Sequence, residues 1–387
     1  MKRKTFKFRM YPNKKQDALL WKSLQQCRMI YNELLEIRSD MCYEFRLSLN
    51  KNDTINYIKI NNKKGILHSQ VAQNVAARVD RSFQNFFEKR AKYPKFRKTY
   101  SYSSFTYPQS GFKFVSSKRI KLSMIGEVKI KKSREVLGTM KSCTVKRTKS
   151  GKWYVCIQCE LADHEYFEEP EYSNNNAVGL DIGIKSFASL SDGTVISNPR
   201  HLLNSEKKLK REQRRLSRKR KGSRNRIKQI KKLARIHEKV ANQRSDFHYQ
   251  TAHWLVNHYD LVAVEDLSPQ FMIKNHRLAK HASDVGITQF FNILEYEAHK
   301  HQTVGVYVKP YNTSQMCSSC HKIVSKELSE RTHRCPYCGF VCDRDTNAAI
   351  NILEGIPDEY KQTHTLLRDG TAGLVGTHTP VETVIPG

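Results

Sequence analysis

The chain has 387 residues and a formal net charge of +31, from 68 Lys and Arg against 37 Asp and Glu. That length suits about two or three domains, and the basic excess favours a polyanionic partner, because binding to phosphates releases their counterions. A membrane partner is not expected, since no apolar run approaches the ~20 residues of a transmembrane helix and the basic start lacks the apolar segment of a secretory signal.

The N-terminal region combines one strand with helices. Residues 2–11 alternate apolar and polar side chains, as a half-buried strand does, and the run ends at Pro12. Helical spacing of apolar residues follows, first from Leu20 to Leu34 and then from Ala72 to Phe87. The Asn- and Lys-rich stretch between these two helices is predicted to be a loop.

From residue 95 to about residue 163 the pattern changes to short strands separated by turn signals. Strands at this spacing predict a small barrel or sandwich, which the first strand is expected to join. The helices at 18–94 are then an insertion. The polar faces of the strands carry cations that either contact phosphates or are simply solvated: Lys121, Lys129, Lys131, Lys146 and Arg147.

The second half of the chain alternates strands with helices, which predicts an α/β domain. An acidic linker near Glu168 precedes it, and Asp192-Gly193 predicts a two-residue hairpin. A nearly all-apolar strand ends in two acids at Glu265, and helix, strand and helix follow. The Gly/Thr/Pro-rich C-terminal tail is predicted to be disordered.

Residues 207–244 are strongly basic, with 18 Lys or Arg against two Glu. We expect a helical hairpin broken at Gly222, with a cationic outside and a further helix after it. A solvated coiled coil would mix its charges for i,i+4 pairing. The break separates the apolar positions Leu209 and Leu216 from the rest of the expected seam, which is Ile227, Ile230, Ala234, His237 and Ala241.

A four-cysteine pattern is the strongest local motif. Its two C-x₂-C pairs are separated by fourteen residues, as in a structural zinc site. The four residues are Cys317, Cys320, Cys335 and Cys338. Such a Zn²⁺ site fits a reducing compartment. A third C-x₂-C pair, Cys156 and Cys159, falls in a strand pattern that points its side chains to opposite faces, so it is expected to pack rather than bind metal.

Three acidic positions are candidates for catalysis. Asp181 lies in an apolar strand, Glu265 or its neighbour Asp266 ends another, and Asp343 or Asp345 opens a helix. Functional groups of α/β sheets collect at strand ends, and carboxylates there suit Mg²⁺. The alternatives are a structural or turn acid at the first position and a plain N-cap at the last. Spacing alone does not decide which acid of each pair, Glu265 or Asp266 and Asp343 or Asp345, belongs to the catalytic site.

Three segments together resemble the TnpB family of transposon-encoded, RNA-guided DNA endonucleases, which are similar to type V CRISPR effectors. They are Val178-Gly-Leu-Asp181-Ile-Gly-Ile, Val262-Ala-Val-Glu265-Asp-Leu and Asp343-Arg-Asp345-Thr-Asn-Ala-Ala, with the cysteines between the last two. The N-terminus, from Phe6 to Gln16, Tyr93-Pro-Lys-Phe-Arg-Lys and the segment from Val240 to His248 also resemble that family. The resemblance covers nearly all of residues 1–354.

The resemblance implies a multidomain fold, α/β plus β-barrel. An RNase H-like RuvC core would span 173–315 and 340–354, with a zinc ribbon at 316–339 inserted in it. A wedge-like β-barrel would comprise 1–17 and 95–168, interrupted by a helical recognition insertion at 18–94, and 355–387 would be a disordered tail.

The resemblance also implies the chemistry. Asp181, Glu265 and Asp345 would bind two Mg²⁺ ions, which Mn²⁺ can replace, for phosphodiester hydrolysis, and the four cysteines would bind Zn²⁺. The partners would be a guide RNA derived from the transposon end and a double-stranded target DNA cut beside a short flanking motif. We expect a monomer in the cytoplasm of a prokaryotic cell, at the nucleoid when on target. The alternative is a nuclease-inactive RNA-guided repressor, against which the presence of all three acids argues.

Overall fold

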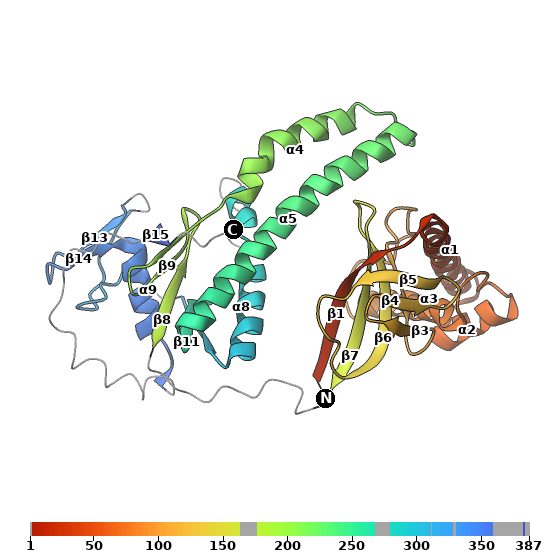
Figure 1. The fold of residues 1–387 in the computed structure, drawn as a ribbon, viewed down its shortest axis with the longest axis horizontal. Helices are drawn as coiled ribbons and strands as arrows, with labels where there is room; N and C mark the ends of the chain where they lie inside the picture. The colour runs from red at the N-terminus through yellow and green to blue at the C-terminus, as the bar shows by residue number, and fades with distance from the viewer. Residues whose placement is uncertain are drawn as a thin grey trace. The chain divides into compact units, whose positions relative to one another are not determined.

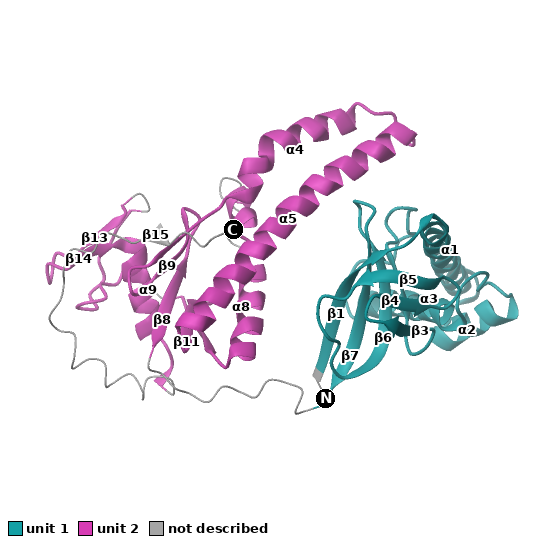
Figure 2. Ribbon diagram, in the orientation of Figure 1, with its two compact units in different colours: residues 1–166 teal, residues 167–387 magenta. Residues whose placement is uncertain are grey.

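The computed structural model describes residues 2–162, 176–267, 279–310, 312–327, 330–358 and 382–383. The chain divides into two compact units, Met1–Tyr166 and Phe167–Gly387, each of which is considered by itself (Figure 2). The expected acidic linker lies outside the described residues. In the described ranges, no helix has the length and apolar character needed to cross a membrane.

Unit 1 is built on a seven-stranded antiparallel sheet (Figure 1). The strands are β1 (Lys2–Tyr11), β2 (Ser104–Tyr107), β3 (Phe112–Ser116), β4 (Arg119–Leu122), β5 (Gly126–Lys131), β6 (Thr139–Arg147) and β7 (Trp153–Leu161). Their order is β2-β6-β7-β1-β5-β4-β3, so the first strand joins the later ones as expected. The described pairings do not join the end strands β2 and β3 to each other, so the expected barrel is an open sheet.

Unit 1 has three helices, α1 (Lys14–Phe45), α2 (Lys51–Ile60) and α3 (Ser69–Phe87). α1 and α3 pack against the sheet, and α2 packs against α3. Asn13 begins α1 with a capping box, in which it and Gln16 each accept a hydrogen bond from the other's backbone nitrogen. The prediction of a loop between the two expected helices is wrong, because α2 lies there. Asn50 and Asp53 form a second capping box that starts α2 in this polar stretch.

The core of unit 1 lies between the helices and the inward face of the sheet. Alternate residues of β1, namely Phe6, Phe8 and Met10, are buried there. The Trp153 indole donates a 2.6 Å hydrogen bond to the Asp17 carboxylate and so ties β7 to α1. The alternation predicted for the first strand is therefore confirmed, since one face packs in the core and the other faces solvent.

Unit 2 contains a six-stranded mixed sheet in the order β12-β11-β8-β9-β10-β15. The strands are β8 (Ala177–Ile182), β9 (Ser186–Leu190), β10 (Val195–Ser197), β11 (Leu261–Glu265), β12 (Val304–Val308) and β15 (Glu382–Thr383). β8, β9 and β10 are antiparallel, whereas β11 and β12 run parallel to β8. The turn between β9 and β10 contains Gly193 at φ +87°, which confirms the predicted hairpin. β15 pairs with β10, so these two tail residues depart from the disorder predicted for 355–387.

Helices cover both faces of the unit 2 sheet (Figure 1). α5 (Arg224–His258) and α8 (Ile287–His301) pack on one face, and α9 (Arg344–Glu354) packs on the other. The strand residues divide accordingly: Val262 and Val264 contact the α5 and α8 side, whereas Leu261 and Ala263 belong to the α9 side. A short helix, α7 (Ala279–Val285), precedes α8.

The basic segment forms the expected helical hairpin, from α4 (His201–Ser217) and α5. Two expectations about it are wrong. α5 is a single helix of 35 residues that includes the helix expected to follow the hairpin. The apolar seam includes Leu209 and Leu216 of α4 as predicted, but on α5 it consists of Leu233 and Ile236 rather than the predicted residues, and Ile230 is 38% exposed.

Buried Glu212 explains why the inward faces of the hairpin helices differ from the predicted ones. Its side chain is only 1% exposed. It accepts a 2.8 Å hydrogen bond from Gln229 and pairs with Lys232 across the hairpin, and it also pairs with Arg215 on its own helix. A buried carboxylate must be paired, so this cluster fixes which face of each basic helix is turned inward.

Close backbone packing places α9 on the sheet. Gly179 of β8 faces α9, and a Cβ atom at this position would overlap the carbonyl oxygen of Ala349 and lie 2.9 Å from the backbone nitrogen of Leu353. Only glycine allows a strand and a helix to approach this closely. The close approach therefore depends on one missing side chain.

We predict that Gly179→Ala destabilises unit 2 by about 1–3 kcal/mol, because the added methyl group must push α9 away from β8. Thermal or urea unfolding of the purified protein measures this. Gly305→Ala is the matched control, since a Cβ in that strand meets nothing within 4 Å. Equal stability of the two variants would contradict the packing argument.

Candidate active site and metal centre

Two of the candidate acids lie on the face of the sheet that α9 covers. Asp181 is two residues beyond Gly179 in β8, and Glu265 is two residues beyond Ala263 in β11, so both share the α9 face. The parallel register pairs Ala263 with Gly179, and the next position on this face of each strand is the acid. Adjacent strands lie ~4.8 Å apart, so the two carboxylates are neighbours.

The third acid completes the group. The pKa of Asp181 is raised to about 7, mainly by burial and then by the negative charges of Asp345 and Glu265, while Arg344 opposes the shift. These mutual effects require the three carboxylates to share one poorly hydrated region. The structure therefore brings together all three acids that the sequence singled out.

The choice between Glu265 and Asp266 follows from strand alternation. Glu265 is half-buried, whereas Asp266 is exposed. The hydroxyl of Thr313 donates a 2.8 Å hydrogen bond to Glu265 Oε1 and orients its carboxylate. Thr313 was not identified from the sequence, because it lies 48 residues away in a loop.

The choice between Asp343 and Asp345 follows from helix capping. Asp343 is the N-cap of α9, and its Oδ1 accepts hydrogen bonds from the backbone nitrogens of Asp345 and Thr346 at 2.8 and 3.2 Å. Asp345 lies in the first turn of α9, and its carboxylate does not cap the helix. It accepts hydrogen bonds from Arg344 at 2.9 and 3.0 Å and pairs with Arg331 at 3.4 Å.

The donor set of this site fits a hard divalent cation. Three carboxylates offer only oxygen ligands, which Mg²⁺ prefers. Burial and then the repulsion from the neighbouring acids raise the pKa of Asp181 to about 7, and a cation in the site would replace its proton. Arg344 and Arg331 supply the positive charge beside Asp345. Neither arginine was singled out from the sequence; the only signal for Arg344 was its position between two acids.

Two asparagines link α9 to the segment that leads into the cysteine cluster. Buried Asn347 donates a 2.7 Å hydrogen bond to the carbonyl of Met316 and accepts one from the backbone nitrogen of Ser318. Asn351 donates to the carbonyls of Thr313 and Met316, both at 2.7 Å. Asn347 belongs to the family-like motif that begins at Asp343, but its contacts and those of Asn351 could not be predicted from the sequence.

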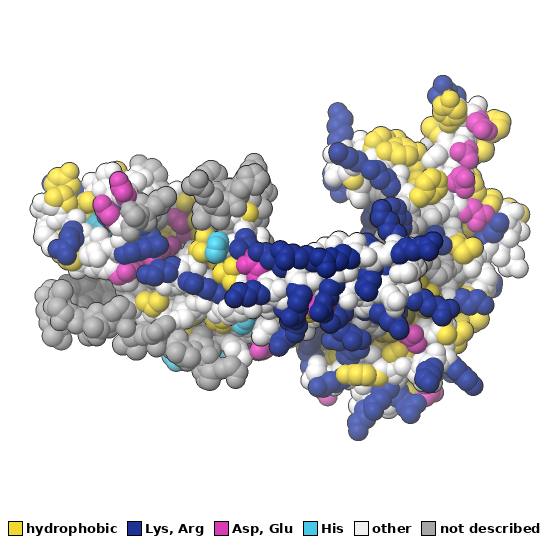
Figure 3. Space-filling view, turned by 90° about the horizontal axis from the view of Figure 1, so that it is seen from above, with side chains coloured by type: hydrophobic (Ala, Val, Ile, Leu, Met, Phe, Trp, Pro, Cys, Tyr) yellow, Lys and Arg dark blue, Asp and Glu magenta, His cyan; other side chains and the backbone are white. Residues whose placement is uncertain are grey.

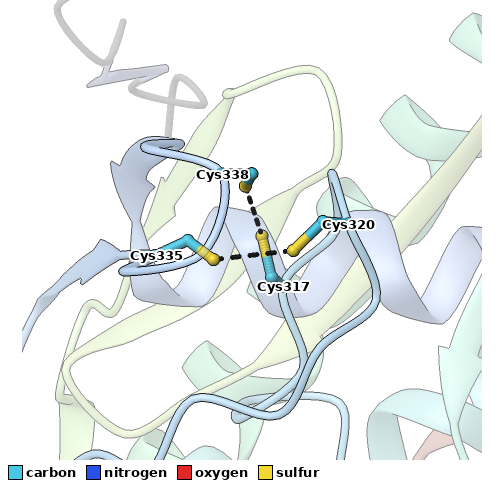
Figure 4. A group of neighbouring side chains, drawn as sticks. All are labelled: Cys317, Cys320, Cys335 and Cys338. Carbon is cyan, nitrogen blue, oxygen red and sulfur yellow. Dashed lines mark hydrogen bonds between the residues drawn. The ribbon is translucent and has the colours of Figure 1, made fainter.

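The four predicted cysteines form one cluster (Figure 4). The sulfur atoms of Cys317 and Cys338 are 3.7 Å apart, and those of Cys320 and Cys335 are 3.5 Å apart. Four thiolates at about 2.3 Å from a tetrahedral Zn²⁺ would be separated by about 3.8 Å, so the geometry fits this ion.

The cysteines of the cluster differ in how readily they ionise. Burial raises the pKa of Cys317. Against the backbone N–H of Lys322, burial and the neighbouring thiols raise the pKa of Cys320 to about 12. Although burial opposes ionisation, the backbone N–H groups of Cys338 and Tyr337 and the neighbouring thiols lower the pKa of Cys335 to about 6. The short strands β13 (Thr332–Arg334) and β14 (Val341–Asp343) pair beside this cluster and lead directly into α9. Cys156 and Cys159 lie in β7 with alternate burial, as expected for packing residues.

Three family models match the chain. A "Probable transposase" model matches residues 155–276, a "Cas12f1-like, TNB domain" model matches residues 288–352, and a "Helix-turn-helix domain" model matches residues 1–46. In the structure this last range consists of β1 and the single helix α1. The first two ranges contain the acids and the cysteines.

Curated relatives extend the likeness to most of the chain. A "Putative RNA-guided DNA endonuclease" of Streptomyces pristinaespiralis is 32% identical over 91% of this chain and 89% of its own length. The "Putative RNA-guided DNA endonuclease InsQ" of Escherichia coli K12 is 30% identical over 91% of this chain and 92% of its own length. The chain belongs to the TnpB family. The family resemblance noted in the sequence is thus confirmed.

A solved structure shares the fold of this TnpB-family chain. It is the protein in a cryo-EM structure of a Cas12f1–sgRNA–target DNA complex, which matches with a TM-score of 0.56 at 14% identity. The match covers 88% of this chain and 83% of that chain. At this identity the likeness concerns the fold alone, and it supports a Cas12-like arrangement with an open sheet, an α/β core and a cysteine-bearing insertion.

We predict that Cys335→Ser removes the tightly bound zinc, because serine supplies no thiolate to a four-cysteine site. Metal analysis of protein after gel filtration measures the loss. Cys342→Ser is the matched control, since Cys342 lies outside the cluster of four. Tightly bound zinc that persists unchanged in Cys335→Ser would show that the four thiols do not form the site.

Proposed function

We propose that this TnpB-family protein is an RNA-guided DNA endonuclease of a transposon, with Asp181, Glu265 and Asp345 at its catalytic centre. One observation carries the proposal: three acids from β8, β11 and α9 lie close enough that burial, together with the charges of Asp345 and Glu265, raises the pKa of Asp181 to about 7. A cluster of this kind is costly unless it binds cations. Both relatives described above are named as putative RNA-guided DNA endonucleases, which supports the same function.

Mg²⁺ is the proposed cofactor at these acids. When bound, a pair of such ions supplies an activated water and stabilises the leaving oxygen in phosphodiester hydrolysis. The chain's own residues prepare the site. Asp181 gives up its proton, Thr313 fixes the Glu265 carboxylate, and Arg344 orients Asp345 through two hydrogen bonds. Zn²⁺ at the four cysteines has the structural role of holding the ribbon beside α9.

The α4–α5 hairpin is the proposed nucleic-acid surface of unit 2. Lys and Arg side chains line it (Figure 3), and residues 207–244 hold 18 of them against two Glu. Of those two acids, Glu212 is buried inside the hairpin and so does not neutralise its outer surface. Phosphate binding to this surface would be strongly salt-dependent.

Unit 1 contributes a second surface on the outer face of its sheet. Lys7 lies 4.6 Å from the centre of the Tyr154 ring, and Arg9 lies between Tyr154 and Tyr11 at 5.2 and 5.4 Å. Cations interleaved with aromatic rings suit both the backbone and the bases of a nucleic acid.

Most of the sheet cations noted in the sequence also face outward. Lys121, Lys129, Lys131 and Lys146 are exposed and available to phosphates. Arg147 is not, because it is half-buried and lies 4.5 Å over the Trp21 ring. Its packing role corrects the expectation that it belongs to the cationic surface.

The proposed domains follow the family. The wedge comprises 1–17 and 95–168, the helical insertion 18–94, the RuvC-type nuclease 173–315 and 340–354, and the zinc ribbon 316–339. A guide RNA from the transposon end selects double-stranded DNA by base pairing, next to a short flanking motif, while the protein contacts the backbone of the duplex. A monomer carries all three acids and needs no second copy to complete the site.

We predict that Asp181→Ala and Glu265→Ala lower cutting of guide-matched DNA by at least about 100-fold, since each removes a metal ligand. Cleavage assays with the RNA-loaded protein and Mg²⁺ measure this, and mobility shifts should show unchanged DNA binding. Asp266→Ala is the matched control and should cut normally, because that neighbouring acid is exposed. An Asp181→Ala variant that cuts at the wild-type rate would refute the assignment, and a wild-type protein that binds without cutting would favour the repressor.

We predict that Mg²⁺ binds about tenfold more tightly at pH 8 than at pH 6. Asp181 must lose its proton to bind the ion, and its pKa of about 7 means that the proton is mostly present at pH 6 and mostly absent at pH 8. The same raised pKa means that the metal-free fold loses stability as the pH rises from about 4 to 7, because the unfolded chain ionises first. Calorimetric Mg²⁺ titrations at the two pH values measure the affinities. Equal affinities at the two pH values would contradict the prediction.

A further inference from the structure

A second group of metal-ligating side chains lies between α5 and α8. His253 of α5 and Glu297 and His301 of α8 offer ligand atoms that all lie within 4.8 Å of one another. In the described ranges, this group and the four cysteines are the clusters of histidine, cysteine and acidic residues that meet this distance. Its residues lie within the ranges that two family models match, but the proposed nuclease chemistry does not use them.

The geometry of this group suits a shared ion better than direct hydrogen bonds. His253 Nδ1 and His301 Nε2 lie 3.8 and 3.6 Å from the same oxygen, Glu297 Oε2. These separations are too long for hydrogen bonds. Two ligands at 2.0–2.2 Å from one tetrahedral Zn²⁺ would be about 3.4 Å apart, so small rotamer adjustments would place all three atoms around an ion.

The burial pattern also resembles that of an open metal site. The Glu297 side chain is only 8% exposed, whereas His301 and His253 are 25% and 54% exposed. A buried carboxylate needs a partner of opposite charge. Lys300 provides one, because its ammonium group lies 3.3 Å from Glu297 Oε2 and 3.3 Å from His301 Nε2, where the ion would bind. Its side chain is 43% exposed and can swing into solvent.

The surroundings of the histidines are compatible with neutral, ligating imidazoles. Asn257, one turn after His253, lies 3.1 Å from its Nε2 through the amide group. Rotating that amide by 180° would let its oxygen accept the Nε2 proton, which leaves the Nδ1 lone pair for a metal. The i,i+4 spacing of Glu297 and His301 puts both side chains on one face of α8.

We propose that His253, Glu297 and His301 bind a divalent transition-metal ion, with Zn²⁺ favoured by two imidazole nitrogens and one carboxylate oxygen. Solvent at the exposed His253 side supplies the fourth ligand. The site lies on the α5 and α8 side of the sheet, and the catalytic acids lie on the α9 side. The ion therefore joins the two helices that cover one face of the nuclease sheet and is not part of the catalytic centre.

The test is a calorimetric titration of the full chain with Zn²⁺, after metal analysis shows that the cysteine site is already filled. Every protein titrated carries Asp181→Ala, because the catalytic acids would also bind Zn²⁺. The protein that is otherwise wild type is expected to bind one further ion, with affinity in the micromolar range. His253→Ala and His301→Ala should each weaken this binding at least about tenfold. His299→Ala is the matched control and should bind as the otherwise wild-type protein does, because His299 is an exposed residue of the same helix outside the cluster.

A variant of opposite effect keeps the test independent of folding. Lys300→Gln should tighten Zn²⁺ binding severalfold, because the ammonium group that now neutralises Glu297 no longer competes with the ion. Variants that merely disturb α8 would not produce this gain. Absence of a further ion in the otherwise wild-type protein, or equal affinities of that protein and His301→Ala, would overturn the proposal.

Discussion

The contact between β8 and α9 is the constraint on which the rest of unit 2 depends. Gly179 has no side chain, so the backbone of α9 lies directly against the strand. The same strand carries Asp181 two residues later, and the same helix carries Asp345 in its first turn. A larger residue at Gly179 would separate the elements that bring two carboxylates together. The sheet then contributes Glu265 through the parallel register of β11.

The cysteine cluster is linked to the acids through α9. Asn347 and Asn351 hold the chain from Thr313 to Ser318 against the helix, and Cys317 lies within that segment. Thr313, in turn, holds the Glu265 carboxylate. The segment that leads into the ribbon thus supports both ends of the site: it is held against the helix that carries one acid, and it orients the side chain of another.

The two charge distributions of the chain have different physical roles. The acids are few, close together and partly buried, so they repel one another and hold a proton on Asp181 near neutral pH. The cations are many and mostly exposed, along the α4–α5 hairpin and the outer face of the unit 1 sheet. An anionic polymer held by these cations would bring its own negative charge to the acidic centre. A divalent cation between the acids and a phosphate resolves that repulsion.

Much of the fold and nearly all of the candidate site were predictable from the sequence. Apolar alternation identified β1, a nearly all-apolar run identified β11, turn residues identified the β9–β10 hairpin, and thiol spacing identified the cysteine cluster. Short-range patterns failed where tertiary contacts decide. The seam of the basic hairpin is set by buried Glu212, which was counted only as one of two acids among 18 cations. Helix α2 was missed because two capping residues start it within a polar stretch, and Thr313 was missed because its partner is 48 residues away.

The most direct test of the account is a structure of the RNA-loaded protein with Mn²⁺, in which anomalous scattering locates the ions. The account predicts ions coordinated directly by carboxylate oxygens of Asp181, Glu265 and Asp345, with Asp343 still capping α9. Ions bound elsewhere, or bound by Asp343 in place of Asp345, would contradict it.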